Sequence, residues 1–119
     1  MLPKRVRRLP SHHVGEGLTL IEASGIRARL LGLSLLPGLP RRHALLIPRC
    51  SSVHTFGMRF ALDVLFLGPE HEVLRIEREV RPNRVLACRG AQAVLEAPAG
   101  QIAPFVRAIR AGALAGERG

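Results

Sequence analysis

The amino-acid sequence predicts a small, mostly β (α+β) domain, an antiparallel rolled sheet or barrel of about five to six short strands with one or two short helices. Three observations support this prediction. The 119 residues are one domain's worth of chain. The hydrophobic content of 47% is enough for one core. The apolar runs are short and separated by Pro and Gly, which indicates many local connections.

The first part of the chain contains two candidate strands around one candidate helix. Residues 18–23 alternate between two faces, as a short strand does. From residues 26 to 36 the apolar side chains recur at helical spacing, and Pro37 and Gly38 end the pattern. Residues 44–47 form an apolar run that predicts a second strand.

The most apolar run, residues 62–67, predicts the central strand of the sheet. Both faces of this run are apolar except at Asp63, so we expect a neighbouring strand on each side. Residues 72–80 alternate imperfectly after a turn, which predicts an antiparallel partner for the central strand. Further short elements complete the pattern: strands at residues 85–88 and 93–97 and a helix at residues 104–110.

Charge is distributed unevenly along the chain. Lys and Arg number 18 against nine Asp and Glu, which gives a formal net charge of +9, and four of the basic residues lie within the first eight positions. We therefore expect a flexible basic arm at residues 1–16, a single compact β-rich domain at residues 17–115 and a tail at residues 116–119. The four Phe residues stand in apolar contexts and offer no platform for stacked bases, which argues against nucleic acid as a partner.

The sequence also bears on location and cofactors. The longest apolar stretch, residues 30–36, is far shorter than the roughly 20 residues of a membrane-spanning helix, and no apolar signal region follows the basic start. We therefore expect a cytoplasmic protein that does not enter a membrane. Cys50 and Cys88 are expected as free thiols, because cytosolic disulfides are rare. With His54 they match no zinc-ligand spacing and no activated Cys–His pair, so we expect no metal and no cofactor.

Two segments carry a family resemblance. Residues 52–67 read SVHTFGMRFALDVLFL, and residues 94–100 contain the order Leu-Glu-x-x-x-Gly. Over about residues 18–113 the chain resembles the domain of unknown function 192 family, a group of uncharacterised small proteins. It departs from the family pattern at Ala61, where members commonly carry Pro, and at His54, where many carry Trp. The resemblance implies a compact β-rich fold and no established activity, cofactor or catalytic residue.

Asp63 is the first candidate functional residue, because it interrupts the most apolar run in the chain. An unpaired buried carboxylate is costly. We therefore predict that Asp63 is buried and accepts hydrogen bonds from Arg59 or from backbone N–H groups of residues 54–60. The alternative is that Asp63 serves as the acid or base of a pocket.

Three further side chains complete the candidate set. His54 lies in the connection before the central strand and is either solvated or hydrogen-bonded, or acts as a base or ligand. Arg59 follows in the same connection and offers a planar fork for a carboxylate or phosphate. Glu96 interrupts a second apolar stretch. It either faces water on an edge strand or forms one polar cluster with Asp63 and Arg59.

Two functions from different classes fit these observations. The first is a non-catalytic binding or accessory domain, for a small molecule or a protein, with a pocket near residues 50–63. The second is a small enzyme that acts on an anionic metabolite, with Arg59 holding the substrate and Asp63 or His54 transferring a proton. Convergence of the four candidate side chains on an open cleft would favour the enzyme, whereas an Asp63 sealed by hydrogen-bond donors would favour the binding domain. The sequence predicts neither the ligand nor the oligomeric state.

Overall fold

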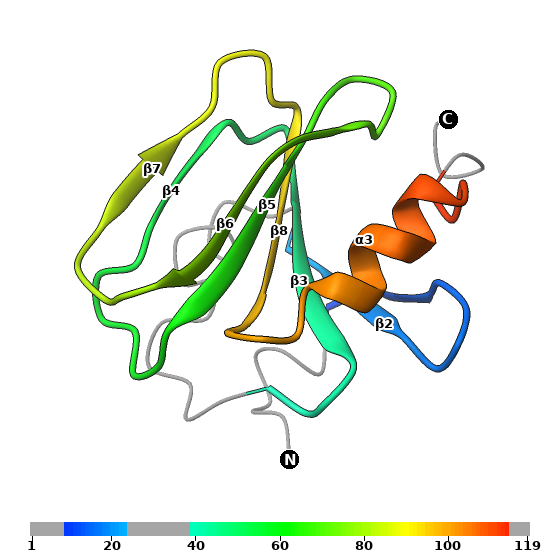
Figure 1. Ribbon diagram of the computed structural model, residues 1–119, viewed down its shortest axis with the longest axis horizontal. Helices are drawn as coiled ribbons and strands as arrows, with labels where there is room; N and C mark the ends of the chain where they lie inside the picture. The colour runs from blue at the N-terminus through cyan, green and yellow to red at the C-terminus, as the bar shows by residue number, and fades with distance from the viewer. Residues whose placement is uncertain (1–8, 24–38, 115–119) are drawn as a thin grey trace.

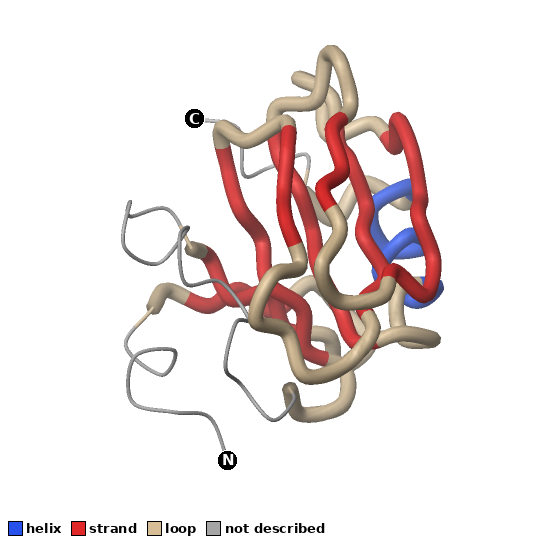
Figure 2. Tube along the Cα trace, turned by 90° about the vertical axis from the view of Figure 1, so that its left-hand side faces the viewer, coloured by secondary structure: helices blue, strands red, loops and turns tan. Residues whose placement is uncertain are grey.

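A six-stranded sheet separates two other layers of the molecule (Figure 1). The computed structural model describes residues 9–23 and 39–114. A two-stranded ribbon lies on one side of the sheet and a helix on the other, and Figure 2 shows strands in front of the helix. The large sheet consists of β1 (Ser11–His13), β2 (Thr19–Glu22), β3 (His43–Pro48), β8 (Ala93–Pro98), β5 (Leu62–Leu67) and β6 (Val73–Val80), in this spatial order. The ribbon pairs β4 (Ser52–His54) with β7 (Val85–Ala87), and the helix is α3 (Ala103–Arg110).

The predicted fold class is confirmed. All strand pairs are antiparallel except β2 and β3, which run parallel. The sheet ends at β1 on one side and β6 on the other, so it is rolled and does not close into a barrel. The described residues form eight strands in two sheets, more than the five or six expected, because the three-residue strands β1 and β4 lack a recognisable apolar pattern.

Strand β1 lies within the segment expected to be a flexible arm. Ser11–His13 pair with β2, and the backbone N–H of Glu22 donates to the carbonyl of Pro10 at 2.8 Å. The sheet therefore begins before residue 17, the expected start of the domain. An edge strand needs a backbone partner more than it needs apolar side chains, so its polar sequence gave no signal. Residues 1–8, the helix predicted at residues 26–36 and the tail at residues 116–119 lie outside the described residues.

Strand β5 is the central strand that the apolar run predicted. All six of its residues are buried, and it pairs with β8 on one side and β6 on the other. Its side chains alternate between two apolar clusters: Leu65 and Leu67 face the cluster that includes α3, whereas Val64 and Phe66 face the cluster beneath the ribbon. Burial on both faces explains why this run carries almost no polar side chain.

Helix α3 covers the first of these clusters. A Pro lies in the first turn of the helix. Proline is favoured there because the N–H that it lacks would have no partner within the helix. Phe105 and Ile109 are buried, one helical turn apart, and pack on the same cluster as Leu65. The spacing of these apolar residues thus predicted both the helix and the face it buries.

Asp63 faces the helix side of the sheet and is completely buried. One carboxylate oxygen, Oδ1, accepts the backbone N–H of Glu79 at 3.0 Å. The other, Oδ2, accepts the N–H groups of Gly100 at 2.9 Å and Ile102 at 3.3 Å. Burial and backbone hydrogen bonding were predicted, but the predicted donors, Arg59 and residues 54–60, are wrong.

The reason for this difference is the alternation of side chains along β5. Asp63 shares its face with Leu65, whereas Met58 and Phe60 of the preceding connection pack on the opposite cluster. The carboxylate therefore meets donors from β6 and from the start of α3. The connection that holds Arg59 lies on the other side of the sheet.

The Asp63 hydrogen bonds hold two irregular pieces of backbone. Strand β6 has a bulge at this point, because Arg78 and Glu79 both lie opposite Asp63. Glu79 has a φ of 55°, which is unfavourable for a residue with a side chain. Gly100 has a φ of 86° in the turn before α3, which glycine adopts readily. The carboxylate thus joins the bulge, the central strand and the beginning of the helix.

We predict that replacing Asp63 destabilises the fold in a graded way. Asp63→Ala leaves one buried N–H group, that of Ile102, and two partly buried ones, those of Glu79 and Gly100, without an acceptor. It should lower the free energy of unfolding by about 3–5 kcal/mol. Asp63→Asn should cost less, because its amide oxygen can still accept from Gly100 and Ile102. Urea denaturation of the purified variants measures both values. Unfolding free energies within about 0.5 kcal/mol of wild type for both would contradict a structural role.

Candidate functional site

The strongest candidate site lies where two connections meet at one end of the ribbon, at the lower left of Figure 1. These connections, residues 54–59 and 81–84, are called the Thr55 tip below. Thr55 is buried, and its hydroxyl donates to the carbonyl of Arg81 at 2.8 Å and accepts the N–H of Arg84 at 2.8 Å. The Thr55 backbone N–H also donates to the carbonyl of Arg84 at 2.9 Å. One buried threonine therefore fixes the two connections against each other.

Two aromatic rings are exposed at the Thr55 tip. The rings of His54 and Phe56 stack with their centroids 5.2 Å apart and an interplanar angle of 25°. The Nδ1 atom of His54 accepts the backbone N–H of Phe56 at 3.2 Å, which orients the imidazole. Phe56 is 49% exposed, and Val85, directly opposite His54 in the ribbon, is 66% exposed. The tip thus presents an apolar, aromatic surface to solvent.

The chain segments on either side of these rings carry basic residues and no acidic ones. Residues 49–61 and 81–95 contain five Arg and no Asp or Glu. All five guanidinium-bearing residues are exposed. Within the described part of the chain, no ion pair joins Arg59, Arg81 or Arg84 to a carboxylate. The Thr55 tip therefore combines exposed rings with uncompensated positive charge.

The four sequence candidates lie in three separate places. His54 and Arg59 belong to the Thr55 tip, as their places in one connection suggested. Asp63 is sealed on the helix side of the sheet and takes no part in the tip. Sequence reasoning missed Phe56, because all four Phe residues were taken to stand in apolar contexts that offer no stacking platform. The absence of acidic residues from both connections was the signal that could have identified the tip.

Glu96 lies on the ribbon side of the sheet, in the middle of β8. It is 4% exposed, and its register neighbours are Leu45 of β3 and Val64 of β5. Among the described residues no hydrogen bond or ion pair reaches its carboxylate. Burial raises the pKa of the Glu96 carboxyl to about 7, because desolvation disfavours the charged form.

Both positions expected for Glu96 are wrong. Strand β8 is not an edge strand, because it lies between β3 and β5. Glu96 does not cluster with Asp63 either, because Asp63 is opposite Ala97 and the side chains of Ala97 and Glu96 leave opposite faces of β8. The two carboxylates are thus separated by the sheet itself.

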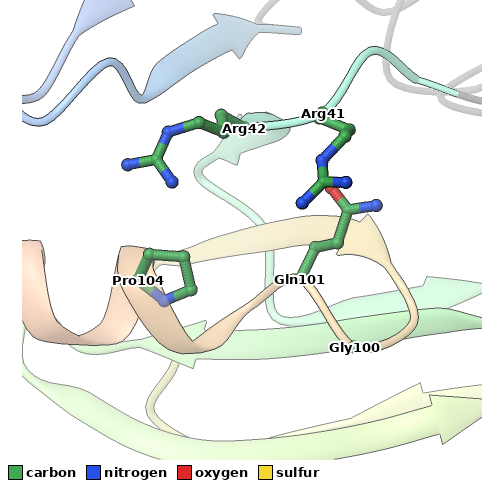
Figure 3. Close-up of a pocket in the computed structure, with 5 residues that line it drawn as sticks. All are labelled: Arg41, Arg42, Gly100, Gln101 and Pro104. Carbon is green, nitrogen blue, oxygen red and sulfur yellow. The ribbon is translucent and has the colours of Figure 1, made fainter.

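A pocket of about 320 Å³ lies elsewhere on the molecule, between the turn before β3 and the start of α3 (Figure 3). Its lining residues are Arg41, Arg42, Gly100, Gln101 and Pro104. It shares no residue with the segment 50–63, where a pocket was expected.

The described residues contain neither a cluster of metal-binding side chains nor a membrane-spanning helix. No group of three or more His, Cys, Asp or Glu side chains there is arranged to hold a metal ion. Cys50 and Cys88 are free thiols, and the Cys50 thiol donates to the carbonyl of Ser52 at 3.0 Å. No helix in the described ranges is both long enough and apolar enough to cross a bilayer.

Comparison with known proteins identifies the family. The family model of the domain of unknown function 192, described as uncharacterized ACR, matches residues 12–113. The chain belongs to the domain of unknown function 192 family. Membership confirms the resemblance carried by residues 52–67 and 94–100, and the match extends upstream to include β1. No curated protein matches the sequence.

Two solved structures share the fold of this family member. A "putative transcription regulator" from Sinorhizobium meliloti 1021 is 22% identical with a TM-score of 0.66, and the match covers 74% of each chain. A protein of unknown function from Novosphingobium aromaticivorans DSM 12444 is 18% identical with a TM-score of 0.65, and covers 88% of this chain and 92% of its own. At these identities the likeness extends to the fold of the family and not to a shared activity.

Glu96 generates a prediction about the pH dependence of stability. A carboxyl whose pKa is about 7 in the folded protein and 4.5 when unfolded holds its proton more tightly in the folded state. Its contribution to stability is therefore complete below pH 4.5 and is lost as the pH rises through 7. Glu96→Gln, which cannot ionise, should raise the free energy of unfolding at pH 8 by about 2–3 kcal/mol and change it little at pH 4.5.

Urea denaturation at the two pH values measures this effect. Glu79→Gln is the matched control, because Glu79 is exposed and its side-chain charge is solvated. Equal gains at pH 4.5 and pH 8, or no gain at either, would contradict a buried and titrating Glu96.

Proposed function

We propose that the protein is a non-catalytic binding domain whose site, the Thr55 tip, takes a small anionic ligand that carries a flat ring, such as a nucleotide. The observation that carries this proposal is the exposed stack of His54 and Phe56 on two connections whose arginines, Arg59, Arg81 and Arg84, form no ion pair with a carboxylate of the described residues. The tip belongs to the segment near residues 50–63 in which the sequence suggested a binding site.

The ring-binding part of the proposal rests on Phe56. A half-exposed aromatic ring gains free energy when another flat ring covers it. His54 stacks against one side of the Phe56 ring and so helps to hold it in place. The Nδ1 atom of His54 is occupied by the Phe56 N–H, which leaves Nε2 for a ligand.

The anion-binding part rests on the arginines. Arg81 and Arg84 lie on the connection that Thr55 holds against the rings, and Arg59 lies on the ring-bearing connection itself. Guanidinium groups bind phosphate through paired, charge-assisted hydrogen bonds. A ligand with a ring and a phosphate a few bonds apart would use both features of the tip.

The alternative enzyme, with Asp63 as acid or base, has weaker support. Both oxygens of the Asp63 carboxylate accept backbone N–H groups, and the side chain has no exposed surface. An acid or base must reach its substrate directly or through one water. A ligand at the Thr55 tip would lie on the other side of the sheet from Asp63.

A cytoplasmic location is also part of the proposal. Cys50 and Cys88 are free, as expected in a reducing compartment.

We predict that the protein binds adenosine monophosphate more tightly than either adenosine or ribose 5-phosphate, because each of these lacks one of the two recognised groups. Phe56→Ala should weaken binding about tenfold through loss of stacking. Arg84→Gln should weaken binding of adenosine monophosphate without affecting adenosine. Isothermal titration calorimetry at low salt measures each affinity.

Arg107→Gln, an exposed substitution on α3, is the control for general loss of positive charge. A labelled oligothymidylate distinguishes two sources of the ligand: tighter binding per nucleotide than the monomer would identify single-stranded nucleic acid. Binding that Phe56→Ala and Arg107→Gln weaken equally, or no binding of any probe, would overturn the proposal.

A further inference from the structure

The pocket lined by Arg41 and Arg42 has the features of a second anion site. Its volume of about 320 Å³ lies at the small end of the range for ligand pockets. Figure 3 shows both guanidinium groups on one side of the pocket, with Gln101 and Pro104 on the other. The lining thus offers two cations and a side-chain amide, together with an apolar ring.

Arg42 is held in place by backbone. Its Nε atom donates to the carbonyl of Glu16 at 3.1 Å, and one terminal nitrogen donates to the same carbonyl. Its backbone has a φ of 64°, within the tight turn that leads into β3. A guanidinium fixed on one side in this way loses less conformational freedom when its remaining N–H groups bind a ligand.

The described residues offer no charge partner for either arginine of the pocket. Across residues 9–23 and 39–114, no carboxylate forms an ion pair with Arg41 or Arg42. The carboxylate of Asp63 accepts the N–H of Gly100, a lining residue of the pocket, and both of its oxygens are occupied by backbone N–H groups. The pocket therefore keeps a net positive charge.

We propose that this pocket binds a compact polyanion, a small ligand with two or more phosphate or carboxylate groups. Each guanidinium can donate a pair of hydrogen bonds to one anionic group. Two guanidinium groups therefore fit a ligand with two anionic groups better than a ligand with a single one. Gln101 can donate or accept at a third position.

This site is independent of the function proposed above. It shares no residue with the Thr55 tip, and its ligand needs no flat ring. Substitutions at each site can therefore be tested against the ligand of the other.

The experiment is calorimetric titration of the full chain with pyrophosphate and with citrate at low salt. We expect saturable binding of at least one of them at one site, and a loss of affinity of about tenfold or more in Arg41→Gln. Arg41 is the residue of choice because Arg42 also supports the turn through Glu16. Arg110→Gln, an exposed substitution on α3, is the charge-matched control and should bind as wild type does. Preference for pyrophosphate identifies phosphate as the recognised group, and preference for citrate identifies carboxylate.

Thr55-tip variants separate this proposal from the previous one. Phe56→Ala and Arg84→Gln should leave pyrophosphate and citrate affinity unchanged, and Arg41→Gln should leave adenosine monophosphate affinity unchanged. The inference is overturned if neither polyanion binds, if Arg41→Gln binds as tightly as Arg110→Gln, or if Arg84→Gln rather than Arg41→Gln abolishes binding. Thermal unfolding of each variant without ligand confirms that the fold is intact.

Discussion

Three backbone amides that converge on one buried carboxylate determine how the parts of this fold meet. Asp63 belongs to the central strand, and its hydrogen bonds reach the bulge in β6 and the turn that leads into α3. A buried negative charge without such donors would be strongly unfavourable, so the central strand and its neighbours are stable only in this arrangement. The helix is thereby fixed against one face of the sheet, which leaves the other face for the ribbon and the Thr55 tip.

Local patterns predicted local structure well. The burial of β5, the hairpin to β6, the strand β8 and the helix α3 all followed from the periodicity and length of apolar runs. The burial of Asp63 followed too, because the residue interrupts such a run. Its partners did not, since Glu79 and Gly100 reach it only through the bulge and a turn far along the chain. Glu96 was placed wrongly for a related reason: the order of strands decides whether β8 is an edge, and that order is set by pairings distant in sequence.

The candidate site was predicted in part. The sequence selected the correct connection and two of its side chains, His54 and Arg59, from their position before the central strand. It could not supply Arg81 and Arg84, because they reach the site only through the hydrogen bonds of Thr55. Phe56 was not selected, because composition does not distinguish a phenyl ring that is buried from one that is half exposed. The site and the core thus depend on two nearby residues of the segment 54–63. Thr55 holds the two connections of the tip together, and Asp63 joins the central strand to β6 and to the turn before α3.

The place of β8 in the sheet bears on how the chain is made. Strand β8 lies between β3 and β5, yet it is the last strand of the sheet to leave the ribosome. Until it emerges, β3 and β5 lack their shared partner, and the unpaired edge of an apolar strand readily joins other chains. The Asp63 carboxylate also lacks two of its hydrogen-bond donors, the N–H groups of Gly100 and Ile102, until the turn after β8 has been synthesised. The sheet can therefore be completed only late in synthesis.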